Sequence, residues 1–231
     1  MKLDPAGAFG TMAGEYDVIA RKGMPVYDEQ LDAIEDCLND NVATVLELGC
    51  GTGALTARLA NRYADAQIIA IDAAPEMLDI AQDRLRPSGD AARISFRREL
   101  FEKLSLEPES FDLVAANMSL HHLAEKLPFY TMLRQTLRPG GLLVFGDELE
   151  VALPHIEQRY WNAWLAFAEQ PDHLAGDQLA GVLRHTEELD HYETLPRQLE
   201  LLAAAGFARA DCVWRKLNYA VFAAEGQISS A

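Results

Sequence analysis

Cysteine is scarce in this sequence, which has only Cys37, Cys50 and Cys212 among its 231 residues. The three lie far apart and form no CxxC pair, so neither a disulfide framework nor a cysteine-based metal site is expected. Such usage is typical of a reducing compartment, and we therefore predict a cytoplasmic protein.

Long apolar runs are also missing. No uninterrupted hydrophobic stretch has the roughly 20 residues that a bilayer span requires. The first residues, from Met1 to Pro5, contain no apolar segment of the kind that a signal peptide carries. We therefore expect neither a secretory signal nor a membrane partner.

Basic residues are heavily outnumbered. The chain has 20 Lys and Arg against 36 Asp and Glu, a formal net charge of −16. So acidic a surface repels phosphate backbones, which argues against broad binding to nucleic acid or to anionic membranes. Two local groups of basic residues, at 93–98 and 209–216, are interpreted as solvated surface.

The remaining composition is that of an ordinary globular protein, with 49% hydrophobic and 24% charged residues. The length is sufficient for one sizeable core, so a single domain over 1–231 is predicted. Its predicted parts are an N-terminal helical lid (1–41), a core (42–147), a helical substrate or lid insertion (148–194) and a C-terminal helix with a hairpin (195–224).

Strand and helix patterns alternate five times up to residue 147. Apolar runs predict strands at 42–48, 67–71, 94–97, 111–117 and 142–145. Helical spacing of apolar residues predicts helices at 52–63, 75–86 and 126–137. The alternation indicates an α/β fold of the Rossmann-like, doubly wound kind, in which helices cover both faces of a mostly parallel sheet.

The pattern changes after residue 147. An aromatic-rich helix is predicted at 155–169, a polar irregular segment at 171–194 and a helix at 196–205. Strands at 210–214 and 218–223 predict a C-terminal antiparallel hairpin, which makes the sheet seven-stranded. Within the predicted helix 155–169, large apolar and aromatic residues recur at helical spacing, and this stripe is interpreted as core. Trp161 lies off the stripe and is interpreted as a substrate contact. The stripe consists of Ile156, Tyr160, Trp164 and Phe167.

The most informative segment is 45–53, which reads Val-Leu-Glu-Leu-Gly-Cys-Gly-Thr-Gly. Its alternating glycines allow a sharp turn and close approach of a ligand. Glu47 precedes the turn and Asp72 ends the next strand, a layout typical of α/β folds that bind an adenosine. The ligand could be a dinucleotide such as NAD or S-adenosylmethionine. Glu47 disfavours a pyrophosphate and favours an ammonium group, and the turn itself contains no basic residue.

With these residues, the stretch 42–147 resembles the class I S-adenosylmethionine-dependent methyltransferases. The resemblance implies that Glu47 and the backbone from Gly49 to Gly53 hold the methionine end of the cofactor, whose product is S-adenosylhomocysteine. It also implies that Asp72 accepts hydrogen bonds from both ribose hydroxyls. The cofactor-binding residues implied are Tyr16, Glu47, Gly49, Cys50, Gly51, Gly53, Asp72, Ala73, Met77, Glu99, Leu100, Asn117 and Met118.

Two later motifs extend the resemblance. Where the family usually has Gly-Asp and a small residue after the third strand, this chain has Arg98-Glu99-Leu100. Glu99 is predicted to accept from the adenine amino group. The segment 111–117 matches the fourth motif, which implies that Asn117 ends its strand beside the sulfonium. Residues 137–141, Leu-Arg-Pro-Gly-Gly, are the turn expected before the fifth strand.

Methyl transfer in this family is an in-line attack on an activated carbon, so the protein mainly aligns the nucleophile and excludes water. A base is needed only if the nucleophile holds a proton. The candidates are His121, His122 and Glu148, with a packing role preferred for the two histidines. No metal site is predicted, because the histidine- and acid-rich stretch 185–191 fits no recognised ligand spacing and is interpreted as a solvated lid.

The acceptor should be chosen by residues outside the core. Tyr16 and Tyr27 lie where related enzymes close a helical lid over the cofactor. The residues predicted to contact the acceptor are Tyr27, His121, Trp161 and His191. Asn117 is followed by Met118-Ser119 rather than by Pro-Pro and an aromatic residue, which counts against methylation of exocyclic amines on bases.

Three functions remain as hypotheses. The leading one is methylation of a small-molecule acceptor by a monomer or homodimer. The second follows from a weak resemblance of 195–223 to the ends of enzymes that modify the tRNA wobble uridine with a carboxylated cofactor, and the acidic charge disfavours it. The third is a NAD-dependent oxidoreductase, or a binding protein that has lost catalysis.

Overall fold

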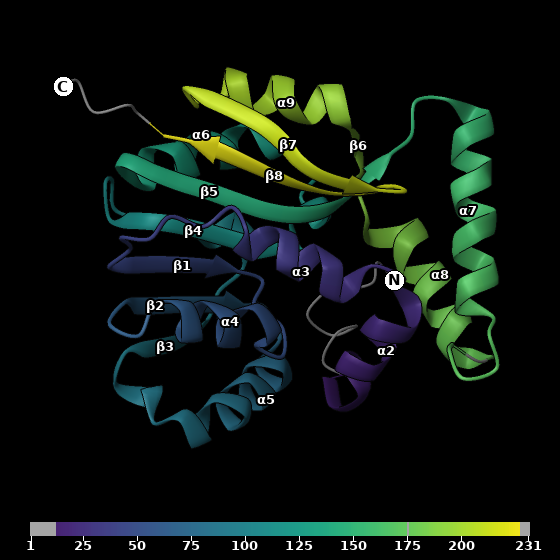
Figure 1. Cartoon of the computed structure of the whole chain (residues 1–231), viewed down its shortest axis with the longest axis horizontal. Helices are drawn as coiled ribbons and strands as arrows, with labels where there is room; N and C mark the ends of the chain where they lie inside the picture. The colour runs from purple at the N-terminus through teal and green to yellow at the C-terminus, as the bar shows by residue number, and fades with distance from the viewer. Residues whose placement is uncertain (1–12, 175, 227–231) are drawn as a thin grey trace.

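The predicted strands lie side by side in one mixed sheet (Figure 1). The computed structural model describes residues 13–174 and 176–226. The strand order is β3-β2-β1-β4-β5-β8-β7, and the two-residue β6 pairs with the end of β5. The strands are β1 (Thr44–Leu48), β2 (Gln67–Asp72), β3 (Ile94–Arg98), β4 (Phe111–Asn117), β5 (Leu137–Glu150), β6 (Glu193–Thr194), β7 (Arg209–Lys216) and β8 (Tyr219–Glu225).

The pairing directions confirm the predicted Rossmann-like class. Strands β1 to β5 pair in parallel, and β8 runs antiparallel to both β5 and β7. Parallel strands are buried on both faces, so they read as continuous apolar runs. Val45 and Leu46, neighbours on β1, are both 0% exposed and belong to the cores on opposite sides of the sheet.

Helices cover both faces. On one face, α3 (Tyr27–Glu35) and α4 (Ala54–Arg62) share a core with Val45 and Val144, while α5 (Pro75–Leu85) packs along β2 and β3. On the other, α6 (Lys126–Thr136) and α9 (Leu195–Ala204) share a core with Leu46 and Phe145. None of the described helices has both the length and the apolar character that a membrane span needs.

Two segments differ from the sequence-based predictions. Strand β5 runs from Leu137 to Glu150 rather than over 142–145, because the chain stays extended on both sides of the Pro139–Gly141 stretch. The segment 171–194, predicted to be irregular, contains the helix α8 (Asp177–Leu189). Its apolar residues are few, but Leu179 and Val182 are three apart and pack together against α2 and α7.

The helices α2 (Tyr16–Gly23), α7 (Pro154–Ala168) and α8 form a lid beside the sheet, beyond the carboxyl ends of its parallel strands (Figure 1). Ile19, Ala168 and Leu174 make the small core of this lid. Trp164 Nε1 also donates a hydrogen bond to the carbonyl of Gly23 at 2.7 Å. The N-terminal helix α2 therefore packs with α7 and α8 of the insertion into one lid. Residues 1–12 of the predicted N-terminal lid lie outside the described residues, and the division into four parts stays a prediction.

Candidate functional site

The turn after β1 has a conformation that requires glycine. Gly49, Gly51 and Gly53 have φ angles of 66°, 51° and 80°, in the left-handed region that residues with a Cβ rarely adopt. A Cβ on Gly49 would also lie 2.5 Å from the Cβ of Ser119. A Cβ on Gly53 would lie 3.0 Å from the Cβ of Ala81, so this glycine serves the packing of α4 against α5.

A cavity opens directly above this turn. Of the predicted cofactor residues, it is lined by Tyr16, Gly49, Gly51, Asp72, Ala73, Met77, Glu99, Leu100, Asn117 and Met118. Its lining also contains four residues that were not among the predicted cofactor contacts, namely Phe101, Glu102, Ser119 and His122. Gly53, Glu47 and Cys50 are not in the lining. Cys50 is buried beside Ala70 and Leu78 and is a packing residue.

Asp72 is fixed in this cavity by the backbone. Its Oδ2 accepts from the N–H of Gly51 at 2.8 Å, and its Oδ1 from the N–H of Ala74 at 2.9 Å. Burial raises the pKa of Asp72, and these backbone hydrogen bonds oppose that rise. A carboxylate has further lone pairs on both oxygens, so the held side chain can still accept from a vicinal diol.

Glu47 lies beneath the turn, 1% exposed. Its Oε2 has no hydrogen-bond partner among the described residues, and burial raises its pKa to about 8. A buried polar atom without a partner is costly, and an ammonium group would satisfy it. The Asp72 carboxylate and the glycine turn in the lining, with the Glu47 carboxyl group buried behind them, therefore fit S-adenosylmethionine and offer nothing cationic to a pyrophosphate.

A second cavity, of about 370 Å³, lies between the lid and the end of β5. Tyr16, Met118 and His122 line both cavities, so the two adjoin at these residues. Met118 has a φ of 52°, uncommon for a residue with a long side chain, and its N–H donates to the carbonyl of Gly146. The chain thus bends at the end of β4, where the two cavities adjoin.

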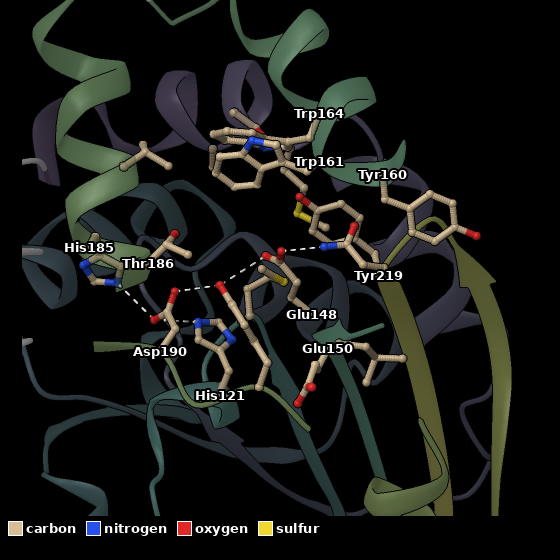
Figure 2. Close-up of a pocket in the computed structure, with 18 of the residues that line it drawn as sticks. His121, Glu148, Glu150, Tyr160, Trp161, Trp164, His185, Thr186, Asp190 and Tyr219 are labelled. Carbon is tan, nitrogen blue, oxygen red and sulfur yellow. Dashed lines mark hydrogen bonds and ion pairs between the residues drawn. The ribbon is translucent and has the colours of Figure 1, made fainter. Parts of the chain in front are cut away.

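One wall of the second cavity is aromatic (Figure 2). Tyr160, Trp161 and Trp164 come from α7, and the two indole rings lie 5.1 Å apart. Tyr27, for which an acceptor contact was predicted, also lines the cavity. Trp161 is 42% exposed and lines the cavity too. The interpretation of Tyr160 and Trp164 as core alone was incomplete, because both are half-buried and part of this wall.

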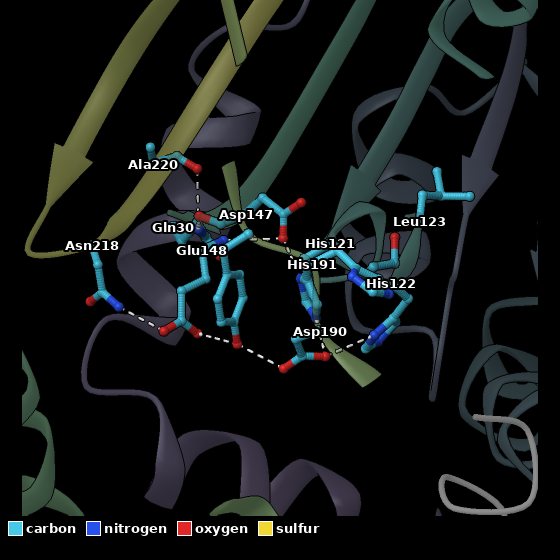
Figure 3. A network of polar contacts seen from close by, with 12 residues as sticks. Gln30, His121, His122, Leu123, Asp147, Glu148, Asp190, His191, Asn218 and Ala220 are labelled. Atoms are coloured by element: carbon cyan, nitrogen blue, oxygen red, sulfur yellow. Dashed lines mark hydrogen bonds and ion pairs between the residues drawn. The ribbon is translucent and has the colours of Figure 1, made fainter. Parts of the chain in front are cut away.

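The opposite wall is a chain of polar contacts (Figure 3). Asn218 Nδ2 donates to Glu148 Oε1 at 2.6 Å, and the Tyr192 hydroxyl lies 3.4 Å from Glu148 Oε2 and 2.7 Å from Asp190 Oδ2. Burial raises the pKa of Glu148 to about 7, and the nearby positive charge of His121 opposes this. A carboxyl group with such a pKa can accept a proton near neutral pH.

Three imidazoles converge on the other oxygen of Asp190. His122 Nδ1 lies 3.0 Å from Asp190 Oδ1, while His121 Nε2 and His185 Nε2 each lie 3.6 Å from it. His121 Nδ1 also forms a short hydrogen bond with Asp147 Oδ1. Burial by itself would lower the pKa of His121, but the charge and hydrogen bond of Asp147 outweigh it and raise that pKa to about 9. Burial lowers the pKa of His185 to about 4.

His191 was predicted to contact the acceptor, but it does not line either cavity. It is exposed, and its N–H donates to the carbonyl of His121. In an extended segment, neighbouring side chains point to opposite sides, so Asp190 and Tyr192 face the cavity and His191 faces away. The cluster of histidines and acids in the sequence correctly pointed to this segment as part of the cavity wall, but the residue chosen from it, His191, does not face the cavity.

Comparison with known proteins supports this description of the core. The sequence pattern of the family described as methyltransferase domain matches residues 45–141. A malonyl-acyl-carrier-protein O-methyltransferase of Paenibacillus sp. (strain JDR-2) is 29% identical over 205 residues, covering 87% of this chain and 69% of the relative. A ubiquinone biosynthesis O-methyltransferase of Cereibacter sphaeroides is 35% identical over 100 residues, covering 43% of this chain and 39% of the relative.

A solved structure shares the fold over nearly the whole chain. It is a protein of Thermotoga maritima described as a S-adenosylmethionine-dependent methyltransferase and possible histamine N-methyltransferase. Its TM-score is 0.64 at 16% identity, covering 96% of this chain and 99% of the other. At that identity the likeness is one of fold alone. These similarities do not confirm the resemblance of 195–223 to the wobble-uridine enzymes.

Proposed function

Because the chain belongs to the class I S-adenosylmethionine-dependent methyltransferases, we propose that it transfers a methyl group from S-adenosylmethionine to a small-molecule acceptor. The observation that carries this proposal is the junction of the two cavities, which Tyr16, Met118 and His122 line from both sides. A donor above the glycine turn and an acceptor beneath the lid would meet there. In-line transfer requires such an arrangement.

The bound donor supplies a methyl group activated by the adjacent positive sulfur. In our proposal, Asp72 holds the ribose, Glu47 the ammonium group and Glu99 the adenine amino group. The lid excludes water from the junction, since α2 contributes Tyr16 to both cavities and is packed against α7 and α8.

The composition of the second cavity favours a small, flat or aliphatic acceptor. A volume of about 370 Å³ is in the range of small-molecule sites, roughly 300–1,000 Å³. Aromatic rings form one wall, and neither Lys nor Arg is among the described lining residues. Acceptors rich in phosphate, including tRNA, would find no Lys or Arg in this lining, and the cationic His121 is already paired with Asp147. The tRNA hypothesis therefore ranks below the small-molecule one.

We propose Glu148 as the proton acceptor when the nucleophile is protonated. Its pKa of about 7 leaves a substantial fraction ionised at neutral pH, and it faces the cavity beside Tyr192 and Asn218. The acceptor atom would take the methyl group from the bound donor, whose sulfur would keep the bonding electron pair, and Glu148 would take the proton that the acceptor atom gives up. S-adenosylhomocysteine and the methylated acceptor leave.

Two measurements test the proposal. In thermal-shift experiments, S-adenosylmethionine and S-adenosylhomocysteine should stabilise the protein and NAD should not. Stabilisation by NAD alone would contradict the proposal. A screen of phenols, carboxylic acids and amines for release of S-adenosylhomocysteine should then find an acceptor, with bulk tRNA as the comparison. Activity on tRNA alone would favour the second hypothesis instead.

A further inference from the structure

We propose that His121, His122 and Asp190 bind a divalent first-row transition metal ion at the polar wall of the acceptor cavity. One ligand atom from each residue lies within 4.8 Å of the others. Two imidazoles and a carboxylate form a ligand set of the kind found in catalytic sites that keep a coordination position open. This assignment replaces the sequence-based expectation that the chain has no metal site.

The distances between the ligand atoms agree with a bound ion. Zinc binds imidazole nitrogen and carboxylate oxygen at about 2.0–2.2 Å, so neighbouring atoms of a tetrahedral site lie about 3.3–3.6 Å apart. In the structure, Asp190 Oδ1 lies 3.0 Å from His122 Nδ1 and 3.6 Å from His121 Nε2. The distance to His121 falls at the tetrahedral spacing and the distance to His122 just below it, and the ligand atoms of the two imidazoles lie within 4.8 Å of each other.

The surroundings of His121 have the arrangement that metal-ligating histidines usually show. Its Nδ1 forms a hydrogen bond with the buried carboxylate of Asp147, and its other nitrogen, Nε2, is directed to Asp190 (Figure 3). A carboxylate on the far nitrogen fixes the ring and makes the near nitrogen a better ligand. Asp147 is itself held, because its Oδ1 accepts from the N–H of Glu148 at 3.1 Å.

The three ligands come from two elements that only the folded chain brings together. His121 and His122 follow β4 in a short 3-10 helix, whereas Asp190 lies between α8 and β6. His185, on α8, approaches Asp190 Oδ1 from a third direction at 3.6 Å and is a positioning residue in this proposal. All four side chains line the acceptor cavity, so the open position of the ion would face the acceptor.

This inference rests on the proposed function only for the role of the ion. A divalent cation at this wall would bind an oxygen of the acceptor and lower the pKa of a hydroxyl group there. The acceptor class is therefore a molecule that presents a hydroxyl or carboxylate oxygen to the metal. Glu148, across the same wall, would take the proton.

The test measures metal binding directly. Tag-free full-length protein is stripped with a chelator, dialysed against Zn²⁺ and analysed for metal content. We expect one zinc per chain in the wild type and in His155→Ala, which removes an exposed histidine elsewhere on the surface. His122→Ala and Asp190→Asn should lose this stoichiometric zinc, and Asp147→Asn should bind about 10- to 100-fold more weakly.

A second measurement, visible absorption of bound Co²⁺, uses the wild-type protein alone and so does not depend on how well the variants fold. Wild-type protein loaded with Co²⁺ should give visible d–d absorption of the intensity that four- or five-coordinate cobalt shows, and zinc should displace it. Absence of stoichiometric zinc from folded wild type, or equal zinc in the wild type and in folded His122→Ala and Asp190→Asn, would overturn the proposal. Binding of S-adenosylhomocysteine is measured on the same samples. Protein that takes up no zinc but binds S-adenosylhomocysteine contradicts only the metal site, and protein that takes up zinc but does not bind S-adenosylhomocysteine contradicts only the proposed function.

Discussion

The carboxylate of Asp72 accepts a hydrogen bond from the backbone N–H of Gly51 at 2.8 Å, so the acid that ends β2 is tied to the turn that follows β1. One side chain thus orders the turn and faces the cavity above it. Removing the Asp72 side chain would therefore disturb both the turn and the cavity lining. For this reason a substitution of Asp72 is the most direct test of the proposed cofactor site.

We expect Asp72→Ala to weaken S-adenosylhomocysteine binding by at least about 10- to 100-fold, because losing even one charge-assisted hydrogen bond costs about 1.5–3 kcal/mol. Isothermal titration calorimetry measures the change. Asp65→Ala, at an exposed position outside the cavity, is the control and should bind normally. Unchanged affinity in Asp72→Ala would show that the second-strand acid does not hold the ribose.

Cofactor binding should release a proton near neutral pH. In the free protein, burial raises the pKa of Glu47 to about 8, so at pH 7 this carboxyl is mostly protonated. An ammonium group beside it favours the charged form and lowers the pKa, so binding at pH 7 expels up to about one proton. Calorimetry in two buffers of different ionisation enthalpy measures it. Glu47→Gln should show no such release, and an equal release in that variant would exclude Glu47 as its source.

Glu148→Gln should slow methyl transfer to a protonated nucleophile by about 10²- to 10⁴-fold, the usual contribution of a positioned base. In the wild type, activity should rise with pH through about 7, as the Glu148 carboxyl loses its proton. The variant should lack this rise. Glu150→Gln changes an exposed carboxylate of the same cavity and should keep the wild-type profile. An unaltered pH profile in Glu148→Gln would exclude Glu148 as the base.

Gly49→Ala should destabilise the protein far more than Gly89→Ala. Both glycines have a left-handed backbone, which costs a residue with a Cβ about 1–2 kcal/mol. Only at Gly49 would the new Cβ also collide with Ser119, which adds about 1–3 kcal/mol of overpacking. At Gly89 nothing lies within 4 Å. Urea unfolding compares the two, and equal losses would show that the turn tolerates a side chain.

The two tryptophans of α7 should separate binding from stability. Trp161→Ala removes a 42% exposed ring and should raise KM for the acceptor with little change in Tm. Trp164→Ala loses the hydrogen bond to Gly23 and contacts with Ile19 and Leu174, and should cost about 2 kcal/mol of unfolding free energy. Equal effects of the two substitutions on both quantities would contradict this division.

The parts of the fold that could be predicted from the sequence are those whose signal is local. The glycine turn, the acid that ends β2 and the alternation of strands each occupy a few consecutive residues, and the structure places Asp72 and Asn117 at the expected strand ends. The helix α8 was missed because its apolar stripe is short and most of its residues are polar.

The polar wall could not be predicted for a different reason. His121, His185 and Asp190 meet only after α8 packs against α2, and no pattern in the sequence records that contact. For His191 the error was one residue, because the side of an extended segment that faces the cavity depends on packing rather than on composition.

The hydrogen bond between Trp164 and Gly23 joins residues 141 positions apart. During synthesis, the glycine turn, β2 and the chain up to β4 emerge long before α7, α8 and β8 do. Contacts of such high sequence separation are slow to form, because the loop between them must close first. The nascent chain therefore carries the residues that line the cavity above the glycine turn well before it has those of the second cavity. Under the proposed function, methyl transfer therefore requires the segments up to β8, whose Tyr219 lines the second cavity.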